Sequence, residues 1–280
     1  MILQDHGDHL VVIRQTDHAT LAGFFAREWG NEVFIRPEPF DSFRLAAAEH
    51  DNGWSEWELN PTIDPATFSP YTFMSIPTAE HIEIYKRGID RIVQEDRYAA
   101  LLAAVHAAGL YDRARATIPG FSAKYVKSNE AQLVAEFVQR LRLQQLRLKV
   151  DLRADAVMKS FAEDKSLQTN AQRLEALDRL SLYFCLAPLA ESTIDAVPRD
   201  EQGGEADWEL RPQADKSVVL TPYPFRRDPL DISILARRIP KQRYANDFDL
   251  QKELALAPYF ALHFTLSANR ADVHTRAAGV

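Results

Sequence analysis

The chain has 280 residues, of which 46% are hydrophobic and 26% charged, a balance typical of a globular protein with a full apolar core. Its 33 basic and 40 acidic residues give a net charge of −7, which argues against binding to duplex nucleic acid. A single cysteine, Cys185, excludes a disulfide framework and favours a cytoplasmic location. The most apolar segment, 101–110, is too short to cross a bilayer, so we expect no membrane association.

The sequence lacks the motifs of several large enzyme classes. It contains no G-x-G-x-x-G, no Walker-type G-K-[ST], no G-x-S-x-G, no H-E-x-x-H and no paired C-x-x-C. These absences argue against Rossmann, P-loop, nucleophile-elbow and zinc-ribbon chemistry. Histidines and carboxylates are the residues left to carry chemistry.

The first half of the chain predicts a hairpin followed by helices. Residues 1–15 contain two apolar runs on either side of a turn-forming cluster, which indicates a β-hairpin. A helix capped by Thr16 or Asp17 then ends at Gly30, and a second helix over 41–51 ends at Asn52-Gly53, a left-handed stop signal. Apolar periodicity predicts further helices over 78–95, 97–110, 128–150 and 170–187.

The last third of the chain predicts short strands. Residues 198–216 are rich in charge and glycine and indicate an exposed connection, whereas 218–220, 232–235 and 259–266 indicate strands. We expect these strands to join the N-terminal hairpin in a small sheet. The predicted fold class is therefore mainly α, with a helical core over 15–190 and a small β appendage, 1–14 and 205–280, packed on it as one unit.

Five ionisable side chains fall on apolar helix faces. Asp178 shares its stripe with Leu174, Ser181 and Cys185, where an unpaired carboxylate is costly unless it meets a cation or a metal. The four others are histidines placed three or four residues from apolar ones: His18, His50, His81 and His106. Packing alone does not require so many.

Each of these residues also has a purely structural interpretation. A histidine on an apolar face is commonly a hydrogen-bonded core residue. Asp178 has three candidate partners for an ordinary ion pair, Arg14, Arg142 and Arg147. The segment 49–53 fits a plain helix end, with the histidine favoured by the helix dipole. The functional interpretation therefore depends on the combination of the five residues.

Imidazole nitrogen and carboxylate oxygen together suit first-row divalent metals. His50 and Asp51 are adjacent, about 100° apart on a helix, and can both lean toward one ion near a helix end. His18 from an earlier helix and Asp178 from a later helix would complete such a site.

The order H…HD…D on separate helices resembles the HD-domain superfamily of metal-dependent phosphohydrolases over roughly residues 15–190. Asp17-His18, 49–51 and Asp178 carry the match. The string 50–54, HDNGW, also resembles the core of a bacterial family with no assigned function. Two features depart from the HD pattern: the interval between Asp51 and Asp178 is long, and no subfamily signature names a substrate.

The resemblance implies an HD-domain-like helical bundle that binds one or two divalent ions of manganese, iron, zinc or nickel. The implied metal ligands are His18, His50, Asp51 and Asp178. Asp51 would bridge two ions, and His81 and His106 occupy plausible positions for binding the second ion. The candidate catalytic residues are accordingly Asp51, His81 and His106.

The function implied is hydrolysis of a phosphoric ester or anhydride in a small phosphorylated metabolite or nucleotide, with metal-activated water as the nucleophile. Trp54, Lys124 and Arg142 are candidate substrate contacts. Two alternatives stay open. Some HD-fold proteins with a similar pattern hold a di-iron pair and oxidise carbon substrates, and a non-catalytic HD-like protein would instead bind a ligand or partner through the β appendage.

Overall fold

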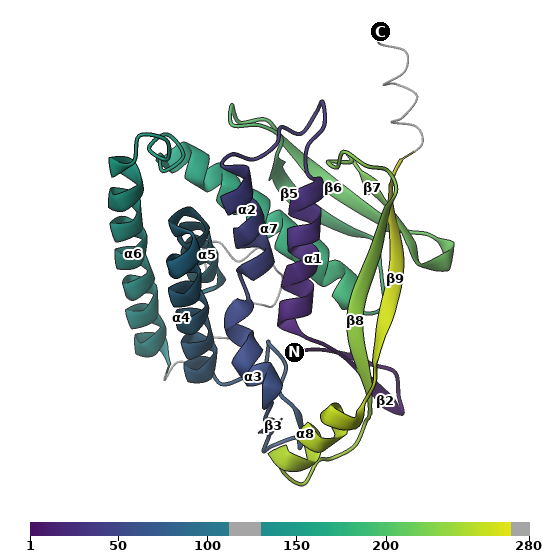
Figure 1. Cartoon of the computed structure of the whole chain (residues 1–280). Helices are drawn as coiled ribbons and strands as arrows, with labels where there is room; N and C mark the ends of the chain where they lie inside the picture. Colours follow the sequence, from purple (N-terminus) through teal and green to yellow (C-terminus); the bar gives the residue numbers. More distant parts are fainter. Residues whose placement is uncertain (112–129, 270–280) are drawn as a thin grey trace.

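The computed structural model describes residues 1–111 and 130–269, which form a group of helices beside a curled sheet (Figure 1). The helices are α1 (Gln15–Glu28), α2 (Phe40–Glu49), α3 (Ser55–Leu59), α4 (Thr78–Glu95), α5 (Arg97–Tyr111), α6 (Ala131–Ala154), α7 (Asp164–Cys185) and α8 (Asp247–Leu256), with the 3-10 turns η1 (Asn52–Trp54) and η3 (Ala214–Lys216). The strands are β1 (Ile2–Asp5), β2 (His9–Ile13), β3 (Ile63–Asp64), β4 (Ser69–Pro70), β5 (Ser192–Pro198), β6 (Glu205–Pro212), β7 (Ser217–Thr221), β8 (Leu230–Pro240) and β9 (Tyr259–Ala268). None of the helices described has the length and apolar character needed to span a membrane.

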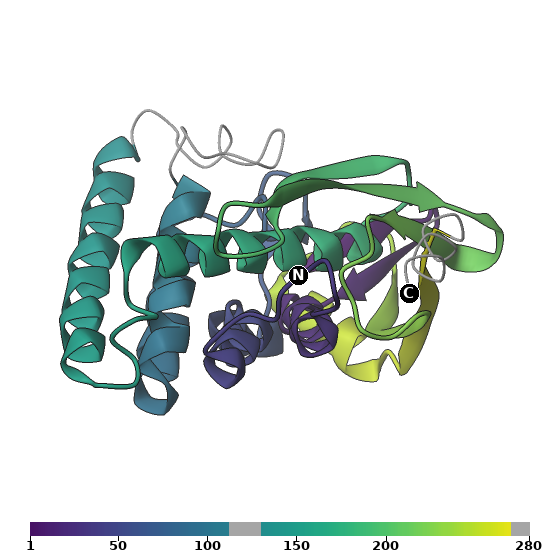
Figure 2. The same cartoon turned by 90° about the horizontal axis from the view of Figure 1, so that it is seen from above.

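Seven strands form the main sheet in the order β1-β2-β8-β9-β7-β6-β5, and β3 and β4 pair separately. All neighbours are antiparallel except β7 and β9, which are parallel. In β8, Leu230, Ile232 and Ile234 are buried and alternate with exposed residues, as a strand with one face on a core requires. That face meets the helices, since α1 packs against β8 and α7 against β5 (Figures 1 and 2).

The predicted fold class is wrong. The chain is an α/β protein rather than a mainly α bundle with a small β appendage, because the sheet has seven strands and supplies one wall of the core. The expected HD-domain architecture is wrong for the same reason: an HD domain is helical, whereas here α1 and α7 bury apolar surface against a large mixed sheet. The hairpin does join this sheet, through the pairing of β2 with β8.

The segment 198–216, predicted as an exposed connection, contains β6 and the 3-10 turn η3, and β5 ends at its first residue. Along β6, buried Trp208 and Leu210 alternate with charged residues that face solvent. The charge content of this segment therefore belongs to the outer face of a strand. The charges of this segment conceal the two-residue period of β6, and β5 lies where the sequence pattern predicted no element.

The predicted helices are confirmed: 78–95 has the ends predicted for it, and the others differ by one to several residues at one or both ends. Gln15, the first residue of α1, has no capping side chain before it in sequence. Glu58 of α3 takes that role: its buried carboxylate accepts hydrogen bonds from the backbone N–H groups of Gln15 and Thr16, at 2.5 and 3.5 Å. Burial raises the pKa of Glu58, although the charged N-terminus of Met1 and these hydrogen bonds oppose the rise.

Small residues bring the helices that carry the candidate site close together. A Cβ on Gly23 of α1 would lie 2.6 Å from the Cβ of Ala48 on α2. Gly53 lacks the positive φ that its sequence context predicts; it lies in η1 and packs against the backbone of Ile84 and Gly88 on α4. The absence of a side chain at Gly53 therefore permits a close approach, and this contact fixes the segment that follows His50 and Asp51.

We expect Gly53→Ala to lower the free energy of unfolding by about 1–3 kcal/mol or more, because the new methyl group would overlap the carbonyl oxygen of Ile84. Gly109→Ala is the matched control: a Cβ at Gly109 on α5 meets no atom within 4 Å, and alanine there should stabilise the helix by about 0.5–1 kcal/mol. Urea unfolding of both variants measures the difference. Equal stability of Gly53→Ala and the wild type would contradict the close contact.

Candidate metal centre

Four helices bring five buried side chains together. His18 lies on α1, His50 and Asp51 follow α2, His106 lies on α5 and Asp178 on α7. These helices contact one another as α1–α2, α1–α7, α2–α5, α2–α7 and α5–α7. The structure thus unites the four residues predicted as metal ligands and adds His106 to them.

The donor atoms lie within a few ångströms of one another. The Nε2 atom of His18 is 3.1 Å from Oδ2 of Asp51 and 3.6 Å from Oδ1 of Asp178. The Nε2 atom of His50 is 3.9 and 3.4 Å from the same two oxygens, and Nε2 of His106 is 3.8 Å from Oδ2 of Asp178. All five side chains are at least 94% buried, so the cluster is screened from bulk water.

Ser181 fixes which nitrogen of His18 carries its proton. The Ser181 hydroxyl donates to the backbone carbonyl of Asp178 at 2.8 Å, and a carbonyl can only accept. The oxygen of Ser181 is therefore the acceptor for Nδ1–H of His18, 2.8 Å away. With Nδ1 so occupied, Nε2 is the atom of His18 that faces the two carboxylates, and it lies at hydrogen-bond distance, 3.1 Å, from Oδ2 of Asp51.

His50 has the same arrangement. Its Nδ1–H donates to the carbonyl oxygen of Ala47 at 3.0 Å, which leaves the lone pair on Nε2. Within the described part of the chain, that buried Nε2 atom has no hydrogen-bond partner. A lone pair that faces carboxylate oxygens is repulsive unless a cation lies between them, either a proton or a metal ion.

The charges in the cluster also require a cation between the histidines and the carboxylates. Burial alone would lower the pKa of His50, but the Coulombic attraction of Asp51 and Asp178 outweighs burial and raises that pKa to about 9. Burial would raise the pKa of Asp51 and of Asp178, but the facing histidines outweigh it and hold both carboxyls well below their usual range. Two ionised carboxylates therefore lie in the core and require positive charge beside them.

The donor set fits a divalent metal ion. Two overlapping groups, His18–His50–Asp51 and His50–His106–Asp178, each place their ligand atoms within 4.8 Å of one another. Ligands about 2.1 Å from one ion lie about 3.0–3.4 Å apart, close to the separations of the Nε2 and carboxylate atoms here. In both His18 and His50 the Nδ1–H group is hydrogen-bonded to an oxygen. Metal-bound histidines in proteins are usually oriented by a hydrogen bond of this kind.

Two further side chains donate hydrogen bonds to Asp51, and neither of them was predicted as a site residue. Gln15 donates through Nε2 to Oδ2 of Asp51 at 3.0 Å, and the Tyr85 hydroxyl donates to Oδ1 at 2.8 Å. Gln15 lies three residues before His18 on α1, and Tyr85 lies four residues after His81 on α4. Helical spacing from a candidate ligand is the signal that could have identified both.

The structure places His81 beside the cluster rather than in it. Its Nδ1 atom is hydrogen-bonded to the hydroxyl of Tyr111, and its ring packs edge-to-face on Tyr85, 4.9 Å between centroids. Burial lowers the pKa of His81 to about 4, so its imidazole is neutral. Unlike His106, it belongs to neither group of ligand atoms found among the described residues.

The predicted substrate contacts are not gathered at the cluster. Trp54 is fully buried and packs against Trp57 and His81, with ring centroids 5.7 and 5.5 Å away. Arg142 is exposed on α6, a helix that packs against α4 and α5. Lys124 lies outside the residues described.

None of the arginines considered as a partner for Asp178 pairs with it. Arg14 donates to Asp17, while Arg142 and Arg147 are exposed on α6. Over residues 1–111 and 130–269, the ion-pair partners of Asp178 are His18, His50 and His106. An ordinary ion pair with an arginine therefore does not explain the burial of this carboxylate.

We expect the wild-type protein, purified without chelators, to carry about one divalent metal ion per chain and Asp51→Ala to be strongly depleted of it. The reason is that Asp51 faces both His18 and His50. Elemental mass spectrometry measures the metal content. Asp41→Ala, an exposed carboxylate in the first turn of α2, is the control and should keep its metal. Equal, negligible metal in all three proteins after reconstitution would contradict the site.

We expect Ser181→Ala to weaken metal binding by about 10–100-fold, because the His18 ring loses the acceptor that fixes its tautomer. Thr169→Ala is the control, since the Thr169 hydroxyl also donates to a backbone carbonyl of α7 but touches no histidine of the cluster. Titration of metal-free protein with zinc against a competing chelator gives both affinities. An unchanged affinity of Ser181→Ala would show that Ser181 does not orient His18.

Comparison with known proteins gives a family. No curated protein and no solved structure matches the chain. A family model described as "Protein of unknown function (DUF3891)" matches residues 1–241, which include all five cluster residues and strands β1 to β8. The resemblance to HD domains gives way to this match and to the sheet described above. The chain belongs to the DUF3891 family.

Proposed function

We propose that the protein is a metal-dependent hydrolase of a phosphoric ester or anhydride in a small phosphorylated molecule. The observation that carries this proposal is the arrangement of His18 and His50. Both rings direct Nε2 at the carboxylates of Asp51 and Asp178, and in both rings Nδ1 is already hydrogen-bonded to an oxygen. Because both overlapping ligand groups contain His50, and His50 has only Nε2 to offer, we propose a single ion held by His18, His50, Asp51 and Asp178, with His106 beside it.

Manganese, iron, zinc and nickel each suit this mixture of imidazole and carboxylate ligands. When bound, such an ion acidifies a coordinated water and neutralises charge on a phosphoryl oxygen. Asp51 stays ionised and is held by Gln15 and Tyr85, so its oxygens keep a fixed direction toward the histidines. Burial and the fixed partners keep the donor atoms in place before any ligand arrives.

His106 has the features of a proton carrier for this reaction. Burial lowers its pKa, so the ring is neutral, and its Nε2 atom is 3.8 Å from Asp178. His106 and Asp178 are also the most exposed of the five side chains, at 5% and 6%. We therefore assign the open side of the cluster, where a substrate oxygen would arrive, to these two residues.

The di-iron alternative requires a second set of ligands that includes His81. That ring is hydrogen-bonded to Tyr111 and packs on Tyr85 instead. For this reason hydrolysis with one ion is the function proposed. Oxygen consumption by the iron-loaded protein remains the direct check of the oxidative reaction.

We expect the metal-loaded protein to hydrolyse a phosphoric ester or anhydride bond in at least one member of a panel of nucleotides, cyclic dinucleotides and sugar phosphates, detected by chromatography of the products. Chelation should abolish the activity and metal addition restore it. His106→Gln should lower kcat by about 100-fold or more while the metal stays bound, because proton transfer is lost. Asp41→Asn, remote from the cluster, should keep full activity.

The two steps of the proposal fail separately. A metal content near one ion per chain with no hydrolysis of any panel member would reject phosphohydrolysis and keep the metal site. Full activity of His106→Gln would reject the role of His106 alone.

A further inference from the structure

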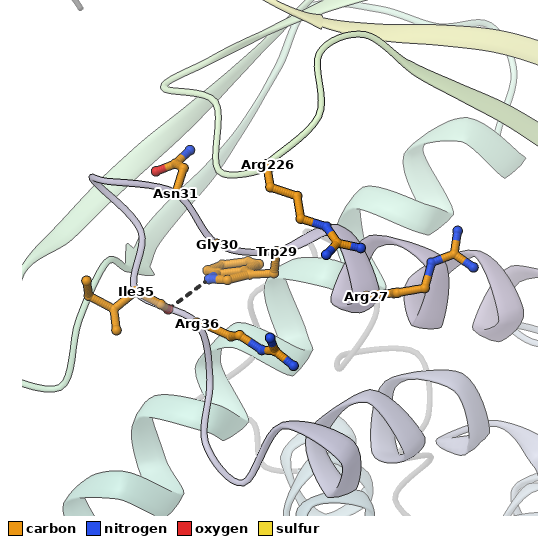
Figure 3. Close-up of a pocket in the computed structure, with 7 residues that line it drawn as sticks. All are labelled: Arg27, Trp29, Gly30, Asn31, Ile35, Arg36 and Arg226. Carbon is orange, nitrogen blue, oxygen red and sulfur yellow. Dashed lines mark hydrogen bonds between the residues drawn. The ribbon is translucent and has the colours of Figure 1, made fainter.

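A second site lies at the opposite end of α1 from the metal cluster. A cavity of about 260 Å³ opens between the end of α1 and the two loops that follow α1 and β7 (Figure 3). Its lining residues are Arg27, Trp29, Gly30, Asn31, Ile35, Arg36 and Arg226. Glu28 is ten residues after His18, about 15 Å along the helix, so this arginine pocket is distinct from the metal cluster.

A buried carboxylate beside the pocket positions its arginines. The side chain of Glu28 is 2% exposed and accepts hydrogen bonds from Nε of Arg27 at 3.0 Å, of Arg226 at 3.1 Å and of Arg227 at 2.8 Å. Each of these hydrogen bonds uses the Nε–H group, so the two terminal nitrogens of each guanidinium do not bind Glu28. Over the described residues, no acceptor lies within hydrogen-bond distance of the terminal nitrogens of Arg226.

Arg36 adds a positive charge that no carboxylate balances. Its guanidinium lies over the ring of Phe40, 3.4 Å from the centroid, which fixes the plane of the group. Within the described chain it forms no ion pair, and no acidic side chain lines the pocket. The single carboxylate Glu28 is shared among three arginines, so the pocket has a large excess of positive charge.

Backbone contacts fix the shape of the pocket. The N–H of Gly30 donates to the carbonyl of Pro224 at 3.0 Å, and the N–H of Arg226 donates to the carbonyl of Glu28 at 2.9 Å. Asn31 donates through its side-chain amide to the carbonyl of Tyr223 at 2.8 Å. Gly30 has φ +118°, a conformation that favours glycine, and allows the chain to turn away from α1 here. The two loops are therefore held together in the absence of any ligand.

We propose that this arginine pocket binds the dianionic phosphate group of a small phosphate monoester. Guanidinium groups with free terminal nitrogens match phosphate oxygens in pairs, and a net positive lining favours a dianion over a monoanion. A volume of about 260 Å³ exceeds that of a phosphate group, so the rest of the monoester also lies within the cavity. This inference does not depend on the hydrolase function.

Isothermal titration of the full chain with inorganic phosphate, glucose 6-phosphate and acetate, at one ionic strength, tests the proposal. We expect both phosphates to bind, the monoester more tightly, and acetate to bind about tenfold more weakly than phosphate. Arg36→Gln should weaken phosphate binding by about tenfold, since it removes a charged donor that does not touch Glu28. Arg36→Lys should recover only part of this loss, because lysine keeps the charge without the planar fork.

Two controls locate the binding. Arg140→Gln removes another exposed arginine, which pairs with Asp90 on α4 and does not line the pocket, and it should leave the affinity unchanged. Asp51→Ala should also keep the affinity, which separates this pocket from the metal cluster. No phosphate binding, equal affinity of the wild type and Arg36→Gln, or loss of binding in Asp51→Ala would each overturn the proposal.

Discussion

The constraint on which the helical half depends is the burial of two ionised carboxylates, Asp51 and Asp178, in an apolar core. A buried carboxylate is strongly destabilising unless positive charge and hydrogen-bond donors surround it. The imidazole rings that face the two carboxylates come from three helices, His18 from α1, His50 from the end of α2 and His106 from α5. The packing of α1, α2, α5 and α7 against one another therefore has to satisfy an electrostatic condition as well as a hydrophobic one.

Helix α1 links this cluster to the sheet and to the arginine pocket. Its first turn is capped by Glu58 and carries Gln15 and His18 into the cluster. Gly23 allows α2 to approach closely, which brings His50 within reach of His18. The last turn carries Glu28, whose backbone and side chain are bound by the loop after β7. A displacement of α1 along its axis would therefore disturb both sites.

Apolar periodicity predicted the helices and the polar residues on their inner faces, because residues spaced three and four apart lie on the same face of an α-helix. It did not separate His81 from His106, since both lie on apolar stripes. What separates them is which helices touch: α5 contacts α2 and α7, whereas His81 on α4 meets Tyr85 and Tyr111. The fold class failed for a different reason. Four ligands in the order H…HD…D on helices resemble an HD domain, but this order does not determine which element packs against the helices. Here a sheet packs against them, and one of its strands is β6. The charged residues of β6 obscured its two-residue alternation of buried and exposed positions.

The chain itself shows how it neutralises a buried carboxylate without a metal ion. Glu28 receives three arginines, whereas Glu58 accepts backbone N–H groups and has its pKa raised by burial. Asp51 and Asp178 are buried to a similar degree, yet the ion-pair partners they have in the described chain are histidines alone. Arginine keeps its proton and cannot bind a metal ion, whereas an imidazole whose Nδ1–H is held by an oxygen can carry either a proton or a metal ion on Nε2. The raised pKa of His50 shows that the two aspartates favour a cation on that nitrogen. The aspartates of the cluster therefore face nitrogens that can exchange a proton for a metal ion, and Glu28 does not.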